Sequence, residues 1–197
     1  TTLGRTLLKL IEPTSGTIIY NGADLKLISK KDLHQLRKDI QIIFQDPYSS
    51  LNPRMTIGDA ISEPLKVHKL TPNARKRKDQ VMELLEKVDL KAAHFNRYPH
   101  EFSGGQRQRI VIARALILNP SFIVCDESVS ALDVSVQAQV LNLLNDLKNE
   151  MGFTNIFISH DLSVVRYISD RIIVMNKGKI EESGQADDIF YHPQTDY

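Results

Sequence analysis

The run "SFIVCDE", residues 121–127, decides the fold class, because it sets four apolar side chains in a row and then ends in two carboxylates. A short continuous apolar run with a polar end is typical of a strand buried on both faces, and such strands form parallel sheets covered by helices. We therefore predict a mainly parallel sheet. Three further segments have the same form: "DIQIIFQ" (39–45), "TNIFISHD" (154–161) and "RIIVMNKG" (171–178).

Helical periodicity fills the segments between these runs. Residues 56–116 contain several helical patterns and no convincing strand, which indicates a helical lobe inserted into an α/β core. We expect one domain, in which residues 1–46 and 117–197 form the core and residues 47–116 form the lobe. Other helical segments are 2–11, 135–151 and 162–169, and a further strand-like segment is 17–22.

Composition excludes several classes of protein. The chain has 25 Lys and Arg against 24 Asp and Glu, which argues against a surface devoted to bulk nucleic-acid binding. We interpret the one basic run, "ARKRK" at 74–78, as a solvated helix end. The single cysteine, Cys125, excludes a disulfide framework and falls inside an apolar strand, where we assign it to the core. No apolar run approaches the length of a membrane span, so any spanning is left to other subunits.

Polar side chains follow three of the predicted strands. Gln45, the pair Asp126 and Glu127, and His160 come at carboxyl ends, which meet at one edge of a parallel sheet. Asp126 is placed to hold Mg²⁺ and Glu127 to deprotonate a water, while Gln45 can contact either and His160 can bind a terminal phosphate. Singly, each has a structural alternative as a cap, a loop residue or a strand-end histidine. Together they predict a catalytic edge.

The stretch "FSGGQRQRIVIARAL", residues 102–116, predicts a phosphate site at the start of a long helix. Ser103 can cap the helix, and Gly104 and Gly105 let the backbone approach a partner closely. Two arginines in the first two turns are unfavourable there unless an anion lies in front of them. The stretch lacks the lysine with which a P-loop reaches terminal phosphates.

Five short motifs follow one another along the chain: "FQDP" (44–47), "FSGGQRQR" (102–109), "FIVCDE" (122–127), "SALD" (130–133) and "FISHD" (157–161). In this order they resemble the nucleotide-binding subunits of ABC transporters over essentially the whole chain. The resemblance implies a P-loop NTPase-like α/β fold, an ABC ATPase cassette that hydrolyses ATP with Mg²⁺. It also implies that Ser103, Gly104, Gly105 and Gln106 contact the ATP of the opposite subunit in a head-to-tail dimer, together with Asp133. The motifs are the signature "FSGGQRQR", Walker B "FIVCDE", the D-loop "SALD" (130–133), the Q-loop "FQDP" and the H-loop "FISHD".

The opening "TT" resembles the last two positions of Walker A, so the resemblance assigns Thr1 and Thr2 to the nucleotide and Thr1, Gln45 and Asp126 to Mg²⁺. The preceding glycines and lysine of that motif are outside the sequence. We therefore expect a cassette that is incomplete at both ends and, as given, neither binds ATP tightly nor hydrolyses it. The family's "DEPTSALD" reads "DESVSALD" here. We expect little consequence for activity, because Ser128 and Val129 lie outside the catalytic positions.

Two stretches, residues 45–65 and 97–116, resemble the subunits that power import of oligopeptides, dipeptides and, in some relatives, nickel. The ending "FYHPQTDY" (190–197) resembles the same subunits. The implied partners are a second ATPase subunit, two transmembrane permease subunits contacted by residues 46–70 and, indirectly, an extracytoplasmic binding protein, with no nucleic acid. The implied location is peripheral, on the cytoplasmic face of the membrane.

Two alternatives remain from the sequence. One is a soluble ABC ATPase that acts on nucleic acid or ribosomes, although only 57 residues separate Gln45 from Ser103 and they lack sustained heptads. The other is a nonenzymatic remnant without Walker A.

Overall fold

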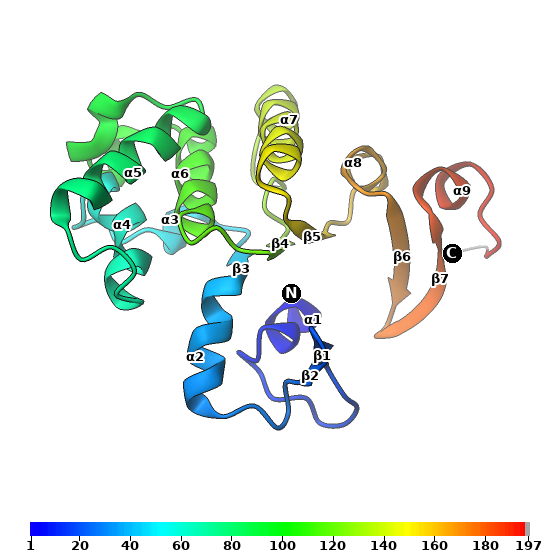
Figure 1. The fold of residues 1–197 in the computed structure, drawn as a ribbon. Helices are drawn as coiled ribbons and strands as arrows, with labels where there is room; N and C mark the ends of the chain where they lie inside the picture. Colours follow the sequence, from blue (N-terminus) through cyan, green and yellow to red (C-terminus); the bar gives the residue numbers. More distant parts are fainter. Residues whose placement is uncertain (196–197) are drawn as a thin grey trace.

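A three-stranded parallel sheet forms the centre of the computed structural model, which describes residues 1–195 (Figure 1). The strands are β3 (Ile40–Ile43), β4 (Phe122–Asp126) and β5 (Thr154–Ile158), in the order β3-β4-β5. Ile42 pairs with Val124, which pairs with Ile156, so the three strands end at the same edge. The parallel sheet predicted from three of the four apolar runs is confirmed.

Both faces of this sheet are covered, which explains the uninterrupted apolar runs. Ile123 and Cys125 of β4 point into the larger core, shared with α6 (Gly104–Leu116) and α7 (Val134–Met151). Val124 points to the opposite face, in a smaller cluster with Leu8 and Ile40. Burial raises the pKa of the Cys125 thiol to about 12, so the thiol behaves as a core group, as predicted.

The face of the sheet that carries the smaller cluster is covered by the N-terminal helix α1 (Thr2–Leu7), whose Gly4 lies against β4. A Cβ on Gly4 would lie 2.9 Å from Val124 Cγ1, so the close approach requires glycine. The predicted helix over 2–11 is too long, because the chain turns at Lys9, which has a φ of 52°. The helix α2 (Lys30–Asp39) leads directly into β3.

The prediction that residues 171–178 join the parallel sheet is wrong. Here β6 (Arg171–Asn176) pairs antiparallel with β7 (Lys179–Gln185) in a separate two-stranded sheet. Lys177 and Gly178 both have positive φ, which is the conformation of a two-residue hairpin turn. The strand-like segment 17–22 likewise forms only β1 (Ile19–Tyr20), paired antiparallel with β2 (Ala23–Asp24) across an Asn-Gly turn.

Residues 47–116 contain helices and no strand (Figure 1). Their separation from the core as a lobe stays our interpretation of the domain organisation. The remaining helices of the chain are α8 (Leu162–Ile168) and α9 (Ala186–Tyr191). Within residues 1–195, no helix is both long and apolar enough to cross a membrane. The helices before α6 are α3 (Pro47–Ser50), α4 (Ile57–Val67), α5 (Ala74–Lys87) and the 3₁₀ helices η1 (Ala92–Asn96) and η2 (Pro99–Glu101).

The resemblance drawn from residues 190–197 lies partly outside the described residues, since 196 and 197 are not described.

Candidate functional site

The carboxylate of Glu127 is the meeting point of the three strand ends. The Gln45 side-chain amide, two residues after β3, donates to Glu127 Oε2 at 3.1 Å. His160 Nδ1, two residues after β5, lies 3.7 Å from the same oxygen. The parallel register thus brings together the three residues that the sequence predicted to act on water and phosphate.

The backbone turns sharply at Glu127 and separates it from its neighbour Asp126. Glu127 has a φ of 51°, in the left-handed region, which costs a non-glycine residue about 1–3 kcal/mol. Its N–H donates to the Ile158 carbonyl at 2.9 Å, and its own carbonyl accepts from Ser130 N and Oγ at 3.1 and 3.0 Å. These bonds hold the strained conformation, so the two carboxylates point into different surroundings.

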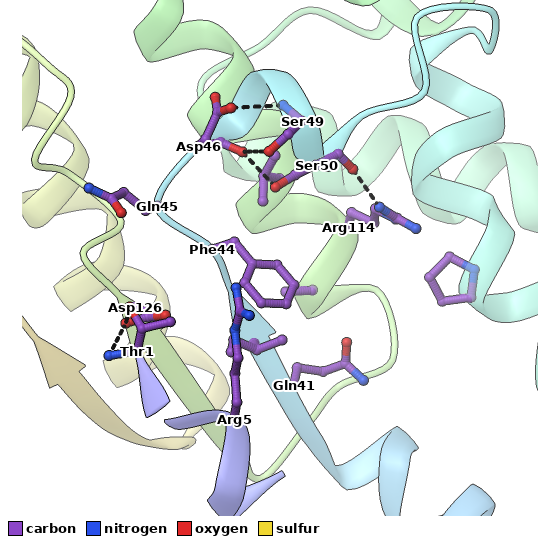
Figure 2. Close-up of a pocket in the computed structure, with 14 residues that line it drawn as sticks. Thr1, Arg5, Gln41, Phe44, Gln45, Asp46, Ser49, Ser50, Arg114 and Asp126 are labelled. Atoms are coloured by element: carbon purple, nitrogen blue, oxygen red, sulfur yellow. Dashed lines mark hydrogen bonds and ion pairs between the residues drawn. The ribbon is translucent and has the colours of Figure 1, made fainter. Parts of the chain in front are cut away.

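Asp126 ends β4 and is only 2% exposed. Its Oδ1 accepts a hydrogen bond from the Thr1 hydroxyl at 3.1 Å. Thr1 is the N-cap of α1 and lies beside the end of the strand (Figure 2). Thr2 begins α1 and is exposed, and its carbonyl accepts from the Thr6 hydroxyl at 2.9 Å. A buried carboxylate beside a hydroxyl offers the oxygen ligands that Mg²⁺ prefers, so these residues fit a magnesium ion.

The helix α6 begins with a capping box. Ser103 Oγ accepts from the Gln106 N–H at 3.3 Å, and the Ser103 N–H donates to Gln106 Oε1 at 3.1 Å. Gly104 is exposed, whereas Gly105 is buried and faces α7. Among the described residues, no hydrogen bond joins this helix start to the edge around Glu127. The nearest neighbour of a Cβ built on Gly104 is Leu132 Cδ2 at 3.7 Å, so the helix start packs against the segment just before Asp133.

Asp133, the remaining predicted nucleotide contact, is the N-cap of α7. Its Oδ1 accepts from the Val136 N–H and from the Ser135 hydroxyl, both at 3.0 Å. The Val136 N–H is the main reason that the pKa of Asp133 lies below its usual value.

A cavity of about 640 Å³ opens beside the catalytic edge (Figure 2). Thr1, Gln45 and Asp126 line one side of it, while Ser50 and Arg114 line the side formed by α3 and α6. The Arg114 guanidinium donates to the Ser50 carbonyl at 2.8 Å and to Glu63 at 2.9 Å. The cavity therefore lies where the sheet edge meets the helices of residues 47–116.

The family described as ABC transporter matches residues 1–130. The chain belongs to the ABC transporter family. Oligopeptide transport ATP-binding protein OppF of Bacillus subtilis is 53% identical over 197 residues, covering 100% of this chain and 65% of that protein. Glutathione import ATP-binding protein GsiA of Escherichia coli is 55% identical over 196 residues, covering 100% of this chain and 31% of that protein.

The chain spans less than two thirds of the length of these relatives. Among solved structures, the dimeric post-hydrolysis state of the ATP-binding cassette MJ0796, bound to ADP and Pi, matches with a TM-score of 0.81. That match has 29% identity and covers 94% of this chain and 79% of that one. It confirms the predicted fold class, a mixed α/β cassette with a parallel sheet.

Sequence reasoning missed two features of this ABC family member. The first two arginines of α6 make contacts within the chain. Arg107 donates to the Pro99 carbonyl at 2.8 Å and lies over the Tyr48 ring. Arg109 donates to the Val88 carbonyl and forms an ion pair with Asp89. They are therefore not evidence for an anion at the helix start. Arg114 of the cavity was also missed, because its partners are 51 and 64 positions away and leave no local signal.

Proposed function

We propose that this chain is part of an ATP-hydrolysing subunit that energises an importer of peptides. The observation that carries the proposal is the convergence of Gln45 and His160 on the Glu127 carboxylate. A carboxylate between an amide donor and an imidazole, at the carboxyl edge of a parallel sheet, is suited to bind and deprotonate a water molecule.

In the proposed reaction, Glu127 accepts a proton from the water whose oxygen attacks the terminal phosphorus of ATP. The bond from that phosphorus to the ADP oxygen then breaks. Gln45 already donates to Glu127, which fixes the carboxylate and leaves the Gln45 amide oxygen available to orient the water. His160, held toward the same carboxylate, can donate to the oxygens of the departing phosphate.

Thr1, Asp126 and Gln45 would hold Mg²⁺, because they bring hydroxyl, carboxylate and amide oxygens to one side of the cavity. A bound Mg²⁺ supplies charge neutralisation for the phosphate oxygens. Asp126 is buried and its Oδ1 already accepts from the Thr1 hydroxyl, so the support for this role is the set of oxygen ligands gathered at the strand end.

A second subunit would supply the other half of the nucleotide site. The start of α6, where Ser103 and Gly104 are exposed, would face the ATP held by that subunit together with Gly105 and Gln106, and Asp133 would lie beside it. The dimer in which MJ0796 was solved supports this arrangement. We also propose two permease subunits, an extracytoplasmic binding protein and a position on the cytoplasmic face of the membrane, and the peptide-transport names of the relatives support this assembly.

The test is Glu127→Gln in the full-length subunit, with ATP hydrolysis and ATP binding measured side by side. Glutamine keeps the shape and loses the basicity, so hydrolysis should fall by about 10²-fold or more while ATP binding persists. Glu181→Gln, on the exposed strand β7, is the matched control and should hydrolyse ATP normally. Hydrolysis by the Glu127 variant at the wild-type rate would remove Glu127 from the role of base.

A further inference from the structure

The turn between α4 and α5 carries a concentration of positive charge that the proposed ATPase does not use. Residues 66–78 contain six Lys and Arg and no Asp or Glu, although the net charge of the whole chain is only +1. Five of these six cations are exposed, and together with the apolar side chains between them they form what we call the α4–α5 basic surface. The five are Lys66, Lys69, Arg75, Lys76 and Lys78.

The sixth cation, Arg77, fixes the shape of this surface from within. Its guanidinium donates to the carbonyls of Thr71 and Pro72 at 2.6 and 2.7 Å. The Leu70 N–H donates to the Leu65 carbonyl at 3.1 Å, which closes the end of α4. The exposed cations therefore project from an ordered turn.

Most of this charge is not neutralised inside the protein. Two of the five cations have partners within the chain: the Lys66 ammonium lies 3.0 Å from Asp59, and the Lys78 ammonium lies 5.4 Å from the centroid of the Phe95 ring. Within residues 1–195, Lys69, Arg75 and Lys76 form no ion pair with a carboxylate. Like charges concentrated in one short segment repel one another, and an anionic partner would relieve that repulsion.

Two large apolar side chains lie among the cations. Val67 is 56% exposed and Leu70 is 45% exposed. Exposed apolar groups bordered by Lys and Arg match a bilayer interface, where the cations meet anionic headgroups and the apolar groups enter the headgroup layer. A nucleic acid would satisfy the cations and leave Val67 and Leu70 in water.

We propose that the α4–α5 basic surface binds the anionic lipid headgroups of a membrane. Its place in the chain supports this partner, because residues 66–70 of the surface belong to the segment 46–70 that we expect to meet the permease. Only this placement rests on the proposed function, since the lipid contact itself requires neither nucleotide nor permease.

The experiment is co-sedimentation of the full-length subunit with vesicles, without nucleotide. Vesicles of phosphatidylcholine with about 30% phosphatidylserine should sediment the chain, pure phosphatidylcholine vesicles should not, and binding should weaken as salt is raised. Protein that sediments without vesicles is subtracted. Replacing three cations, as Lys69→Gln, Arg75→Gln and Lys76→Gln together, should lower the apparent affinity at least about tenfold.

A matched control removes the same charge from the opposite side of the molecule. The β6–β7 hairpin lies far from α4 and α5 (Figure 1) and also carries exposed cations, but beside Glu181 and Glu182. The combination Arg171→Gln, Lys177→Gln and Lys179→Gln should therefore bind vesicles like the wild type. Equal losses in the two triple variants, or unchanged binding after loss of Lys69, Arg75 and Lys76, would overturn the proposal.

The apolar contribution separates lipid from other polyanions. Val67→Ser with Leu70→Ser should weaken vesicle binding by several-fold and leave any binding to a short DNA duplex unchanged. If instead this double variant binds vesicles like the wild type and DNA competes fully with the vesicles, the surface is a general polyanion site and the lipid assignment is wrong. Loss of ATP hydrolysis would not change these readouts, so the two proposals fail separately.

Discussion

Gly105 of the helix α6 lies directly against Val136 of α7. A Cβ placed on Gly105 would meet Val136 Cγ1 well inside 3.0 Å, a separation that real Cβ atoms essentially never show. The two helices can touch here only because position 105 has no side chain. One of the two glycines that the sequence assigned to a nucleotide is thus also required for packing within the chain.

We predict that Gly105→Ala lowers the free energy of unfolding by about 1–3 kcal/mol, because the added methyl group overpacks the contact with Val136. Chemical denaturation measures the change. Val136→Ala should restore much of the loss when combined with Gly105→Ala, whereas Gly104→Ala, with 3.7 Å to its nearest neighbour, should cost less. An additive double variant would show that the Val136 contact does not set the requirement for glycine.

The second prediction concerns the exposed start of α6. In the full-length subunit, Ser103→Arg should block the site completed on the partner's ATP, with a loss of about 10²-fold in hydrolysis there, because a bulky cation fills the approach to the phosphate. ATP binding by the variant's own half-site should persist. The measurement mixes the variant with a subunit whose phosphate-binding loop is disabled.

Ser103→Ala is the control for capping, since it removes the hydroxyl that accepts from Gln106 without adding bulk. It should cost about 0.5–2 kcal/mol of stability and far less activity than the arginine variant. If the arginine variant instead loses its own ATP while the mixed dimer still closes, the assignment of Ser103 to the partner's nucleotide is wrong.

The third prediction is a loss of stability on mild acidification. Burial of the His68 ring, with His34 and Lys38 close to it, lowers the pKa of His68 below its usual 6.5. The unfolded chain therefore takes up the proton at a higher pH than the folded chain. The unfolding free energy should fall as the pH drops from about 7.5 through the folded-state pKa.

His68→Gln should make the unfolding free energy less dependent on pH in this range. Burial also lowers the pKa of His94, so part of the dependence should remain in the His68 variant. A pH dependence identical in the wild type and the His68 variant would contradict the prediction.

The fourth prediction concerns alkaline stability. The Tyr20 hydroxyl donates to Asp39 Oδ2 at 2.6 Å, and burial together with this carboxylate raises the pKa of Tyr20 to about 12. A raised folded-state pKa contributes stability that is complete below about pH 10 and is lost as the pH rises toward 12. Tyr20→Phe should cost about 1 kcal/mol at neutral pH, and its difference from the wild type should shrink across that range. A constant difference would show that the phenol does not titrate as inferred.

Some strands and site residues of this chain could be predicted from the sequence, and others could not. The segments that became β3, β4 and β5 were recognised because a strand buried on both faces must be apolar throughout, a property written along the chain itself. The convergence on Glu127 followed from the same prediction, since parallel strands place their carboxyl ends together. The left-handed turn at Glu127, which separates it from Asp126, depends on a bond to Ile158 in another strand and had no local signal.

By itself the sequence determined the parallel sheet, the helices that cover it and the polar residues at its edge, because burial and periodicity act between near neighbours in the chain. Only the tertiary structure decided that β6 leaves the sheet to pair with β7, that Gly105 must be small because of Val136, and that Arg114 joins Ser50 to Glu63. Each of these outcomes depends on which distant residue occupies the neighbouring space. The composition of a single segment does not contain that information, because contact energies depend on both partners.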